Sequence, residues 1–511
     1  MAAPTSTTGT ISATALHHYR GLNFSADHFG GAKMHLSDWV NVAEALTPQQ
    51  RQRIGLKAPV SLHQASRLVT QITRRAHGCD HEGVALENAF SFGADRLHQS
   101  LIDASIPESV HPSTEYAIDA TDQPAWATWR RAAQFCPDGR RSHKRCNHRM
   151  SADPDATIGY RTASQDQNPL FLGYHAHLAT DVRPIGAEHH APPFVRALSL
   201  VPANSSSATN GLAVVDMLQM THRVTHVLSD RGYTPAIVDK WARPLRERGI
   251  SQSLDLKEVQ KKRSPGPASL PQTVFIAGTL FPEGLPLRLR DIERPHFAAE
   301  SGLRAAAREL FDERAQFAFL PFTTPTADGR VRFRGPAAKG HERVKCVNWP
   351  HSLRVSANLP MTTCTPGNGC SCGKTATLRD EGLQLRQRHV WGTSDWEADY
   401  GRRSAIETAN SALKTHVSHI TRDSIRLMGL AKVSFAYAIL IAVTNIRLFR
   451  SRYGLKPSDP NLPDAILPAP RRRNRKRGNR TTGVVSTQPR PRQQTAGPAG
   501  TFSPPPVPRT S

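Results

Sequence analysis

Four polar residues near the C-terminal third of this 511-residue chain have types and spacing that could do chemistry. They are Tyr400, Arg403, Glu407 and Lys414, separated by three, four and seven positions. On an α-helix, which turns by ~100° per residue, these positions fall within an arc roughly 60° wide. A carboxylate flanked by two cations and a phenol is a poor core face, but it suits a metal ion next to a phosphate chain. The spacing predicts one helix with a polar face; charged residues that only face water are the alternative.

A carboxylate that holds a metal ion needs partners from other parts of the chain. Cleaving or joining a phosphodiester drives an oxygen onto an anionic phosphorus centre, a step that two divalent ions about 3.5–4 Å apart promote. Mg²⁺ prefers oxygen ligands and keeps several waters, so two or three acids should converge on it. Without metal, such acids would repel one another and take up protons.

Two aspartates are candidate partners for Glu407. Asp119 ends an apolar run, as an acid at the end of an inner strand should, and Asp122 is its rival three residues later. Asp230 follows another short apolar run and precedes a turn at Gly232. An aspartate that only closes a turn or caps a helix is the alternative for each.

The quartet matches the Tyr-x2-Arg-x3-Glu-x6-Lys signature of bacterial insertion-sequence transposases of the DDE class, and the chain resembles this family from about residue 114 to 450. In the family, the glutamate is the last of three catalytic acids. The resemblance favours Asp119, which Ala and Thr follow, over Asp122, and the family commonly shows the Asp-Arg-Gly-aromatic pattern present at Asp230. The chain departs from the family at His175, where related transposases often have lysine.

The resemblance implies a site, its cofactors and its partners. The metal-binding catalytic acids would be Asp119, Asp230 and Glu407, and the DNA-binding residues Tyr400, Arg403 and Lys414. The acids would hold two Mg²⁺ or Mn²⁺ ions. The partners would be double-stranded DNA, at terminal inverted repeats and at the target, and a second copy of the chain in a homodimer.

The reaction implied by the resemblance is Mg²⁺-dependent cleavage at the ends of an insertion sequence and transfer of the freed 3′-hydroxyl ends into target DNA. Two alternatives stay open. One is an RNase H-like nuclease without strand transfer, and the other is a non-catalytic DNA-binding protein derived from a transposase.

Hydrophobic patterning predicts the elements that must position the acids. Strands are expected at 114–121, 170–181, 193–204 and 225–233, with a helix at 211–224. Three strands, a helix and another strand indicate an α/β domain with a mixed sheet. This order resembles the RNase H-like fold of DDE transposases, where the first acid lies on the first strand and the second lies just after the fourth. A long apolar helix at 424–450 should pack against the sheet.

Composition breaks divide the chain into six predicted segments. They are a flexible N-terminus (1–34), a helical region that could bind DNA (35–110), the first part of an RNase H-like catalytic domain (111–254), an insertion with a cysteine cluster (255–390), the C-terminal helices of the catalytic domain (391–454) and a disordered, basic, proline-rich tail (455–511). In the second segment, Ser61 should cap a helix that Gly78 ends.

The charge balance indicates a polyanionic partner. Lys and Arg number 66 against 42 Asp and Glu, a net charge of +24, which attracts nucleic acid. Charge that serves solubility or contact with a membrane surface is the alternative. The N-terminus lacks an export signal, and the most apolar stretch, 433–443, is short for a membrane span. We therefore expect a cytoplasmic, nucleoid-associated protein without a membrane partner.

Cysteines and tryptophans offer further candidates. Cys346, Cys364, Cys370 and Cys372 could close a structural zinc site, and cysteines merely buried in the insertion are the alternative. A looser group comprises Cys136, His143, Cys146 and His148, and we do not expect it to bind metal. Trp391 and Trp396 could stack on an unpaired base, but packing in a core is favoured.

Overall fold

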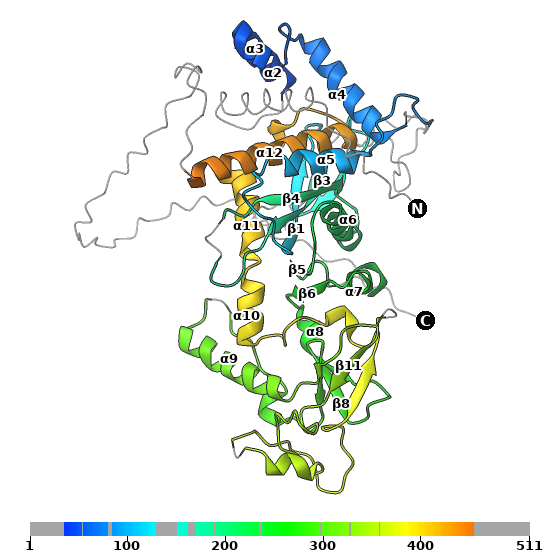
Figure 1. Cartoon of the computed structure of the whole chain (residues 1–511), viewed down its shortest axis with the longest axis vertical. Helices are drawn as coiled ribbons and strands as arrows, with labels where there is room; N and C mark the ends of the chain where they lie inside the picture. Colours follow the sequence, from blue (N-terminus) through cyan, green and yellow to red (C-terminus); the bar gives the residue numbers. More distant parts are fainter. Residues whose placement is uncertain are drawn as a thin grey trace, which may run out of the picture. The chain divides into compact units, whose positions relative to one another are not determined.

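The structure is a computed structural model, and it describes part of the chain. The described residues are 35–453 apart from 54, 80–83, 129–150, 162–169, 188–190, 235–237, 297, 327–328 and 357. The predicted flexible N-terminus, the basic tail and the group of Cys136, His143, Cys146 and His148 lie outside the described residues. The described part is a mixed α/β structure, as the sequence predicts (Figure 1).

A six-stranded mixed sheet lies at the centre of the predicted catalytic segment. Its strands are β1 (Glu115–Pro124), β2 (Thr157–Tyr160), β3 (Leu170–Asp181), β4 (Val195–Pro202), β5 (His226–Ser229) and β6 (Ser251–Leu254). The order is β2-β3-β1-β5-β6, and β4 also pairs with β3. The pairs that join β1, β2 and β4 to β3 are antiparallel, whereas β1, β5 and β6 run parallel. The four predicted strands are confirmed; β2 and β6 were not predicted.

Side chains of β1 alternate between two hydrophobic cores because successive residues of a strand point to opposite faces. Tyr116 and Ile118 lie in the core that includes α6 (Ser207–Gln219) and α7 (Ala242–Glu247). Ala117 lies in the core on the other face, built largely by the apolar helix α12 (Leu430–Tyr453). The sheet is therefore covered on both faces (Figure 1).

The N-terminal helices pack on the α12 side of the sheet. They are α2 (Leu36–Ala45), α3 (Pro48–Arg53), α4 (Leu62–His77) and α5 (Ala94–Asp103). The predicted ends of α4 are confirmed: Ser61 accepts a hydrogen bond from the Gln64 amide in a capping box, and Gly78 ends the helix with a left-handed backbone, φ 74°.

The helix α12 confirms the prediction that a long apolar helix packs against the sheet. Its stretch Leu430–Arg452 has a mean hydropathy of 1.4, so the length and composition of this helix alone would let it cross a bilayer. However, 72% of that apolar window is buried inside the protein. Ala436 and Ile441 are both fully buried in the core that covers the sheet. We therefore interpret α12 as a core helix.

The predicted insertion contains two small antiparallel sheets. One comprises β7 (Arg263–Pro265), β8 (Thr273–Ile276) and β9 (Thr279–Pro282); the other comprises β10 (Leu320–Pro321), β11 (Val331–Arg334) and β12 (Thr375–Leu378). The helices of the insertion are α8 (Glu258–Lys261) and α9 (Ser301–Gln316). Short 3-10 turns lie in the insertion at Leu287–Leu289, Pro350–Arg354 and Leu383–Leu385. Two more 3-10 turns, Val238–Lys240 and Arg422–Ser424, lie outside it. This region has its own hydrophobic clusters, but its limits at 255 and 390 stay a prediction.

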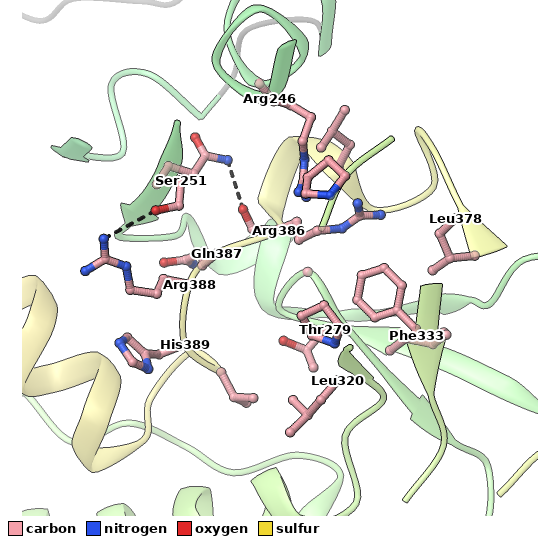
Figure 2. Close-up of a pocket in the computed structure, with 18 of the residues that line it drawn as sticks. Arg246, Ser251, Thr279, Leu320, Phe333, Leu378, Arg386, Gln387, Arg388 and His389 are labelled. Atoms are coloured by element: carbon pink, nitrogen blue, oxygen red, sulfur yellow. Dashed lines mark hydrogen bonds between the residues drawn. The ribbon is translucent and has the colours of Figure 1, made fainter. Parts of the chain in front are cut away.

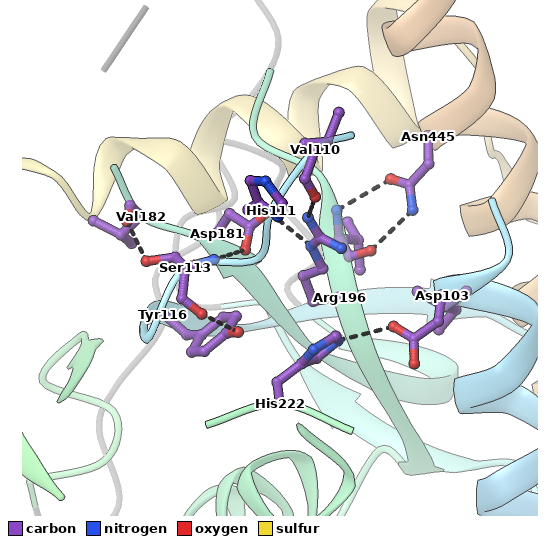
Figure 3. Close-up of polar contacts among 12 residues, drawn as sticks. Asp103, Val110, His111, Ser113, Tyr116, Asp181, Val182, Arg196, His222 and Asn445 are labelled. Atoms are coloured by element: carbon purple, nitrogen blue, oxygen red, sulfur yellow. Dashed lines mark hydrogen bonds and ion pairs between the residues drawn. The ribbon is translucent and has the colours of Figure 1, made fainter. Parts of the chain in front are cut away.

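A buried polar network fixes the start of β1 against the end of β3 and the start of β4 (Figure 3). The Asp181 carboxylate accepts from Arg196 Nε at 2.7 Å and from the Ser113 amide at 3.1 Å. Asn445 of α12 exchanges two hydrogen bonds with the Val195 backbone, at 3.1 and 2.9 Å. Because the buried charge and amide groups have partners here, the network stabilises the register of the sheet.

Candidate metal and phosphate site

The quartet does not lie on one continuous helix, so that prediction is wrong. The chain forms α10 (Ser394–Gly401), then α11 (Ser404–Ser411), then a π-helical turn at Ala412–His416. At the junction the Arg403 amide donates to the Tyr400 carbonyl and the Ile406 amide to the Arg403 carbonyl, three residues back rather than four. The helix is therefore tighter before Glu407 and wider at Lys414 than an even turn of 100° assumes.

A buried ion network holds this junction against the sheet. Arg402 donates to Asp399 and, at 2.7 Å, to Glu115 of β1. Asp399 also accepts from His226 of β5 at 3.1 Å and from Ser253 of β6 at 2.5 Å. Burial would raise the pKa of Asp399, but these donors together hold it well below its usual value. The network thus ties the residue next to Arg403 to three strands.

Sequence reasoning missed this network. The signal available was the spacing of three between Asp399 and Arg402, which suits a pair on a helix. Nothing in the sequence linked that pair to Glu115 or His226, because the link depends on strand pairing.

Asp119 lies on β1, and Asp230 directly follows the neighbouring parallel strand β5. In the register of β1 and β5, Ile118 is paired with Ser229. Asp119 and Asp230 are the next residues along the two segments, and Asp230 lies beyond the end of β5. Ala117, two residues before Asp119 on β1, lies in the α12-side core, so the Asp119 side chain belongs to that face of the sheet. The Asp230 carboxylate accepts a hydrogen bond from the Gly232 amide at 2.8 Å, and its charge raises the pKa of Asp119.

Arg403 connects Asp119 to Glu407. Its Nη2 donates to Asp119 at 3.2 Å and its Nη1 to Glu407 at 2.6 Å. The Asp119 and Arg403 side chains are 19% and 14% exposed, whereas Glu407 is 62% exposed. The Arg403 Nε is buried and has no hydrogen-bond partner among the described residues. One guanidinium therefore lies between an acid that is mostly buried, Asp119, and an acid that is exposed, Glu407.

The site carries more negative charge than Arg403 balances. The pKa of Asp119 is raised to about 6, chiefly by burial; the charges of Asp230 and Glu407 add to the rise, and Arg403 opposes it. The pKa of Arg403 is raised because Tyr400 and the three acids favour its charged form, although burial opposes this. Both shifts indicate that the three carboxylates act on one another electrostatically.

The three acids have the donor type that a hard divalent cation prefers, but they are not arranged as a ligand set around one ion. Carboxylate oxygens are the ligands that Mg²⁺ and Mn²⁺ prefer, and a carboxyl with a raised pKa favours a nearby positive charge. Among the described residues, only the four cysteines bring three or more ligand atoms within 4.8 Å of one another. The three acids are therefore more widely spaced than the ligands of one ion. The guanidinium of Arg403 lies between two of these acids.

The rival acid Asp122 is already neutralised. It accepts from Lys414 at 2.5 Å and from Arg161 at 2.9 Å. Burial would raise its pKa, but these two cations lower it. His175 is paired with Asp122 across β1 and β3, and burial lowers the pKa of His175, so the imidazole is mostly neutral at pH 7. Lys414 thus pairs with Asp122, which is not one of the three acids around Arg403.

The aromatic residues before the junction form a core. Trp391 and Trp396 are 2% and 0% exposed, and the Trp396 indole donates to Gln387 at 2.8 Å. Tyr400 stacks on Trp396 with ring centroids 4.9 Å apart. The favoured prediction of core packing is confirmed, and stacking of either tryptophan on a base is incompatible with this burial. Burial also raises the pKa of Tyr400, so it is a neutral phenol.

A separate hollow of about 320 Å³ lies between β6 and the small sheets (Figure 2). Arg246, Arg386 and Arg388 line it together with Phe333 and Leu378. Burial and the neighbouring Arg246 lower the pKa of Arg386 to about 10, and its Nη1 has no hydrogen-bond partner among the described residues. None of the residues predicted to do chemistry lines this hollow.

Comparison with models of known protein families gave no match, and comparison with curated proteins gave no significant match.

Proposed function

We propose that this protein is a DDE-class transposase that cleaves DNA at the ends of an insertion sequence and transfers the 3′-hydroxyl ends into target DNA. The observation that carries the proposal is the grouping around Arg403. Asp119 lies on β1, Asp230 directly follows the adjacent strand β5, 111 residues later in the chain, and Glu407 shares Arg403 with Asp119.

The topology supports an RNase H-like assignment for this domain. That fold places the first acid on the first strand and the second just after the strand that follows the helix. Here Asp119 lies on β1, and Asp230 follows β5, which comes after α6. The short β2, which pairs with the first residues of β3, makes β5 the fifth strand rather than the fourth.

In this proposal, Asp119, Asp230 and Glu407 would hold two Mg²⁺ or Mn²⁺ ions. When bound, the ions would lower the pKa of the attacking hydroxyl and stabilise the leaving oxygen. The chain itself supplies the fixed geometry. Asp119 is carried by β1, Asp230 follows β5, which pairs with β1, and the Arg402–Asp399 network fixes the helix junction that carries Arg403.

Arg403 is the best-placed phosphate ligand. Its guanidinium is held between Asp119 and Glu407, and each Nη carries a second N–H besides the one that it donates to these acids. A phosphate oxygen accepts charge-assisted hydrogen bonds from such a group. Tyr400 and Lys414 remain predicted DNA contacts. Lys414 can reach a phosphate only by sharing or leaving Asp122, to which it is bonded.

The test is an assay of the full chain on DNA that carries the ends of the element flanking its gene. We expect Mg²⁺-dependent nicking at the ends and joining of a pre-cleaved 3′ end to plasmid DNA. Asp119→Asn, Asp230→Asn and Glu407→Gln should each lower cleavage by at least about 10²–10³-fold, as loss of a preorganised charge does. DNA binding should persist. The matched control is Glu258→Gln, at an acid that is 86% exposed.

The outcomes separate the alternatives. Cleavage without joining of the pre-cleaved end would favour a nuclease. Binding of DNA without any metal-dependent cleavage, unaltered by the three substitutions, would favour a non-catalytic DNA-binding protein.

A further inference from the structure

Four cysteines of the predicted insertion converge in the structure. Cys346 comes from one segment, Cys364 from a second, and Cys370 and Cys372 from a third. Their sulfur atoms all lie within 4.8 Å of one another. The Sγ atoms of Cys346 and Cys370 are 3.5 Å apart, as are those of Cys364 and Cys372. Free thiols have no physical reason to form so compact a group of four.

These distances match one tetrahedral ion. With Zn–S bonds of about 2.3 Å, the edges of a tetrahedron of four sulfurs are about 3.8 Å long. An iron–sulfur cluster fits poorly, because its four cysteines are divided among two or four irons, so the four sulfurs cannot all lie as close together as around one ion. Four thiolates in a closed, tetrahedral set are the usual ligands of structural zinc.

We propose that Cys346, Cys364, Cys370 and Cys372 bind one structural Zn²⁺ ion. This proposal is independent of the proposed transposase activity.

The surroundings are those of a built site. Cys346 and Cys372 are fully buried, and Cys370 is 9% exposed. The Trp349 indole donates to Cys370 Sγ at 3.1 Å, a partner of the kind that orients a ligand and stabilises its negative charge. Gly284 lies so close to Cys364 that a Cβ there would be 2.3 Å from the sulfur. The neighbouring backbone thus leaves room for the ligand.

The ion would add to a small hydrophobic core. Between β11 and β12 the chain has little regular structure beyond one 3-10 turn, Pro350–Arg354. The cysteines belong to the same cluster as Phe281 and Phe317, which come from β9 and the end of α9. Binding one ion would therefore join this long loop to the rest of the insertion, and release of the ion should loosen it.

The experiment measures metal in the full chain purified under reducing conditions without added metal. We expect one zinc per chain by elemental analysis and native mass spectrometry. Modification of thiols with a mercurial should release the zinc to a colorimetric chelator. Co²⁺ exchanged into the protein should give the intense visible absorption of a tetrahedral thiolate site. Zinc below about 0.2 per chain, or iron in its place, would overturn the proposal.

Variants locate the ion. Cys364→Ser and Cys370→Ser should each lower the zinc content at least about fivefold, and protease should then cut between residues 335 and 374. The matched control is Cys79→Ser, at an exposed cysteine elsewhere in the chain, which should keep full zinc. If the sulfurs instead formed two disulfides, the unreduced wild type would contain no zinc and weigh four hydrogens less than the reduced chain, and the proposal would fail. The wild-type measurement decides even if a variant does not fold.

Discussion

Two aspartates that lie three pairs apart along the β1–β3 ladder have opposite environments. Asp181 is paired with Tyr116 in the register, and Asp119 with Leu178. Asp181 is 2% exposed and accepts from Arg196, Arg183 and the Ser113 amide (Figure 3). Asp119 shares a single guanidinium with Glu407 and feels the charge of Asp230.

The difference teaches where charge serves structure and where it can serve function. A buried carboxylate with enough donors holds elements together. A group of carboxylates with too few donors costs stability, and such groups cluster at sites that bind something positive. The comparison predicts that the same kind of substitution has opposite effects on stability in the two regions.

The largest effect on stability is expected at Asp181. Asp181→Asn leaves the buried Arg196 guanidinium without its charged partner, which should lower the free energy of unfolding by about 3–5 kcal/mol. Urea denaturation followed by circular dichroism measures this. A loss below about 1 kcal/mol would show that the network does not stabilise the sheet.

Asp119→Asn should act in the other direction. At pH 7 and without divalent ions it should raise the free energy of unfolding by on the order of 2 kcal/mol, because it removes a carboxylate whose pKa is raised to about 6. The pKa of Asp119 is higher in the folded than in the unfolded chain. The stability that its protonated form contributes is therefore fully present below pH ~4 and is lost as the pH rises through 6. Stability of the wild type should fall across this window relative to the variant. Parallel pH profiles would contradict this prediction.

Arg403→Gln should destabilise the metal-free protein by about 1–2 kcal/mol, because the three acids lose their shared cation. The pKa of Asp119 should then rise above its wild-type value. A carboxyl infrared band or a resolved Asp NMR signal, followed against pH, measures the shift. An unchanged pKa would mean that Arg403 does not govern the site.

Lys414→Met should have the smallest effect, at most about 1 kcal/mol, because Asp122 keeps Arg161 and both partners of the lost pair are partly exposed. Thermal denaturation at low and high salt measures it. A larger loss at low salt would place Lys414 among the structural charges, with Arg196.

Local patterns predicted local structure well. The bounds of β3 follow from its apolar run, and the ends of α4 follow from Ser61 and Gly78, because neighbouring residues decide these features. The sequence also indicated which cysteines would converge. It could not reveal β6, whose four residues Ser251–Leu254 lack a strand pattern and whose place in the sheet depends on pairing with β5.

The candidate site shows the same limit. The spacing of the quartet indicated that its members act together, yet the helix breaks at Arg402, where contacts to Glu115 and Asp399 outweigh an even helical turn. Pairing of Lys414 with Asp122 was also invisible, because it joins residues 292 positions apart.

Binding of Mn²⁺, measured by electron paramagnetic resonance on the metal-free chain, tests the central claim most directly. We predict saturable binding by the wild type that also raises its melting temperature, and loss of both effects in Asp119→Asn, Asp230→Asn and Glu407→Gln, with Asp122→Asn retaining them. Equal binding by the wild type and Asp119→Asn would contradict a shared metal site at these acids.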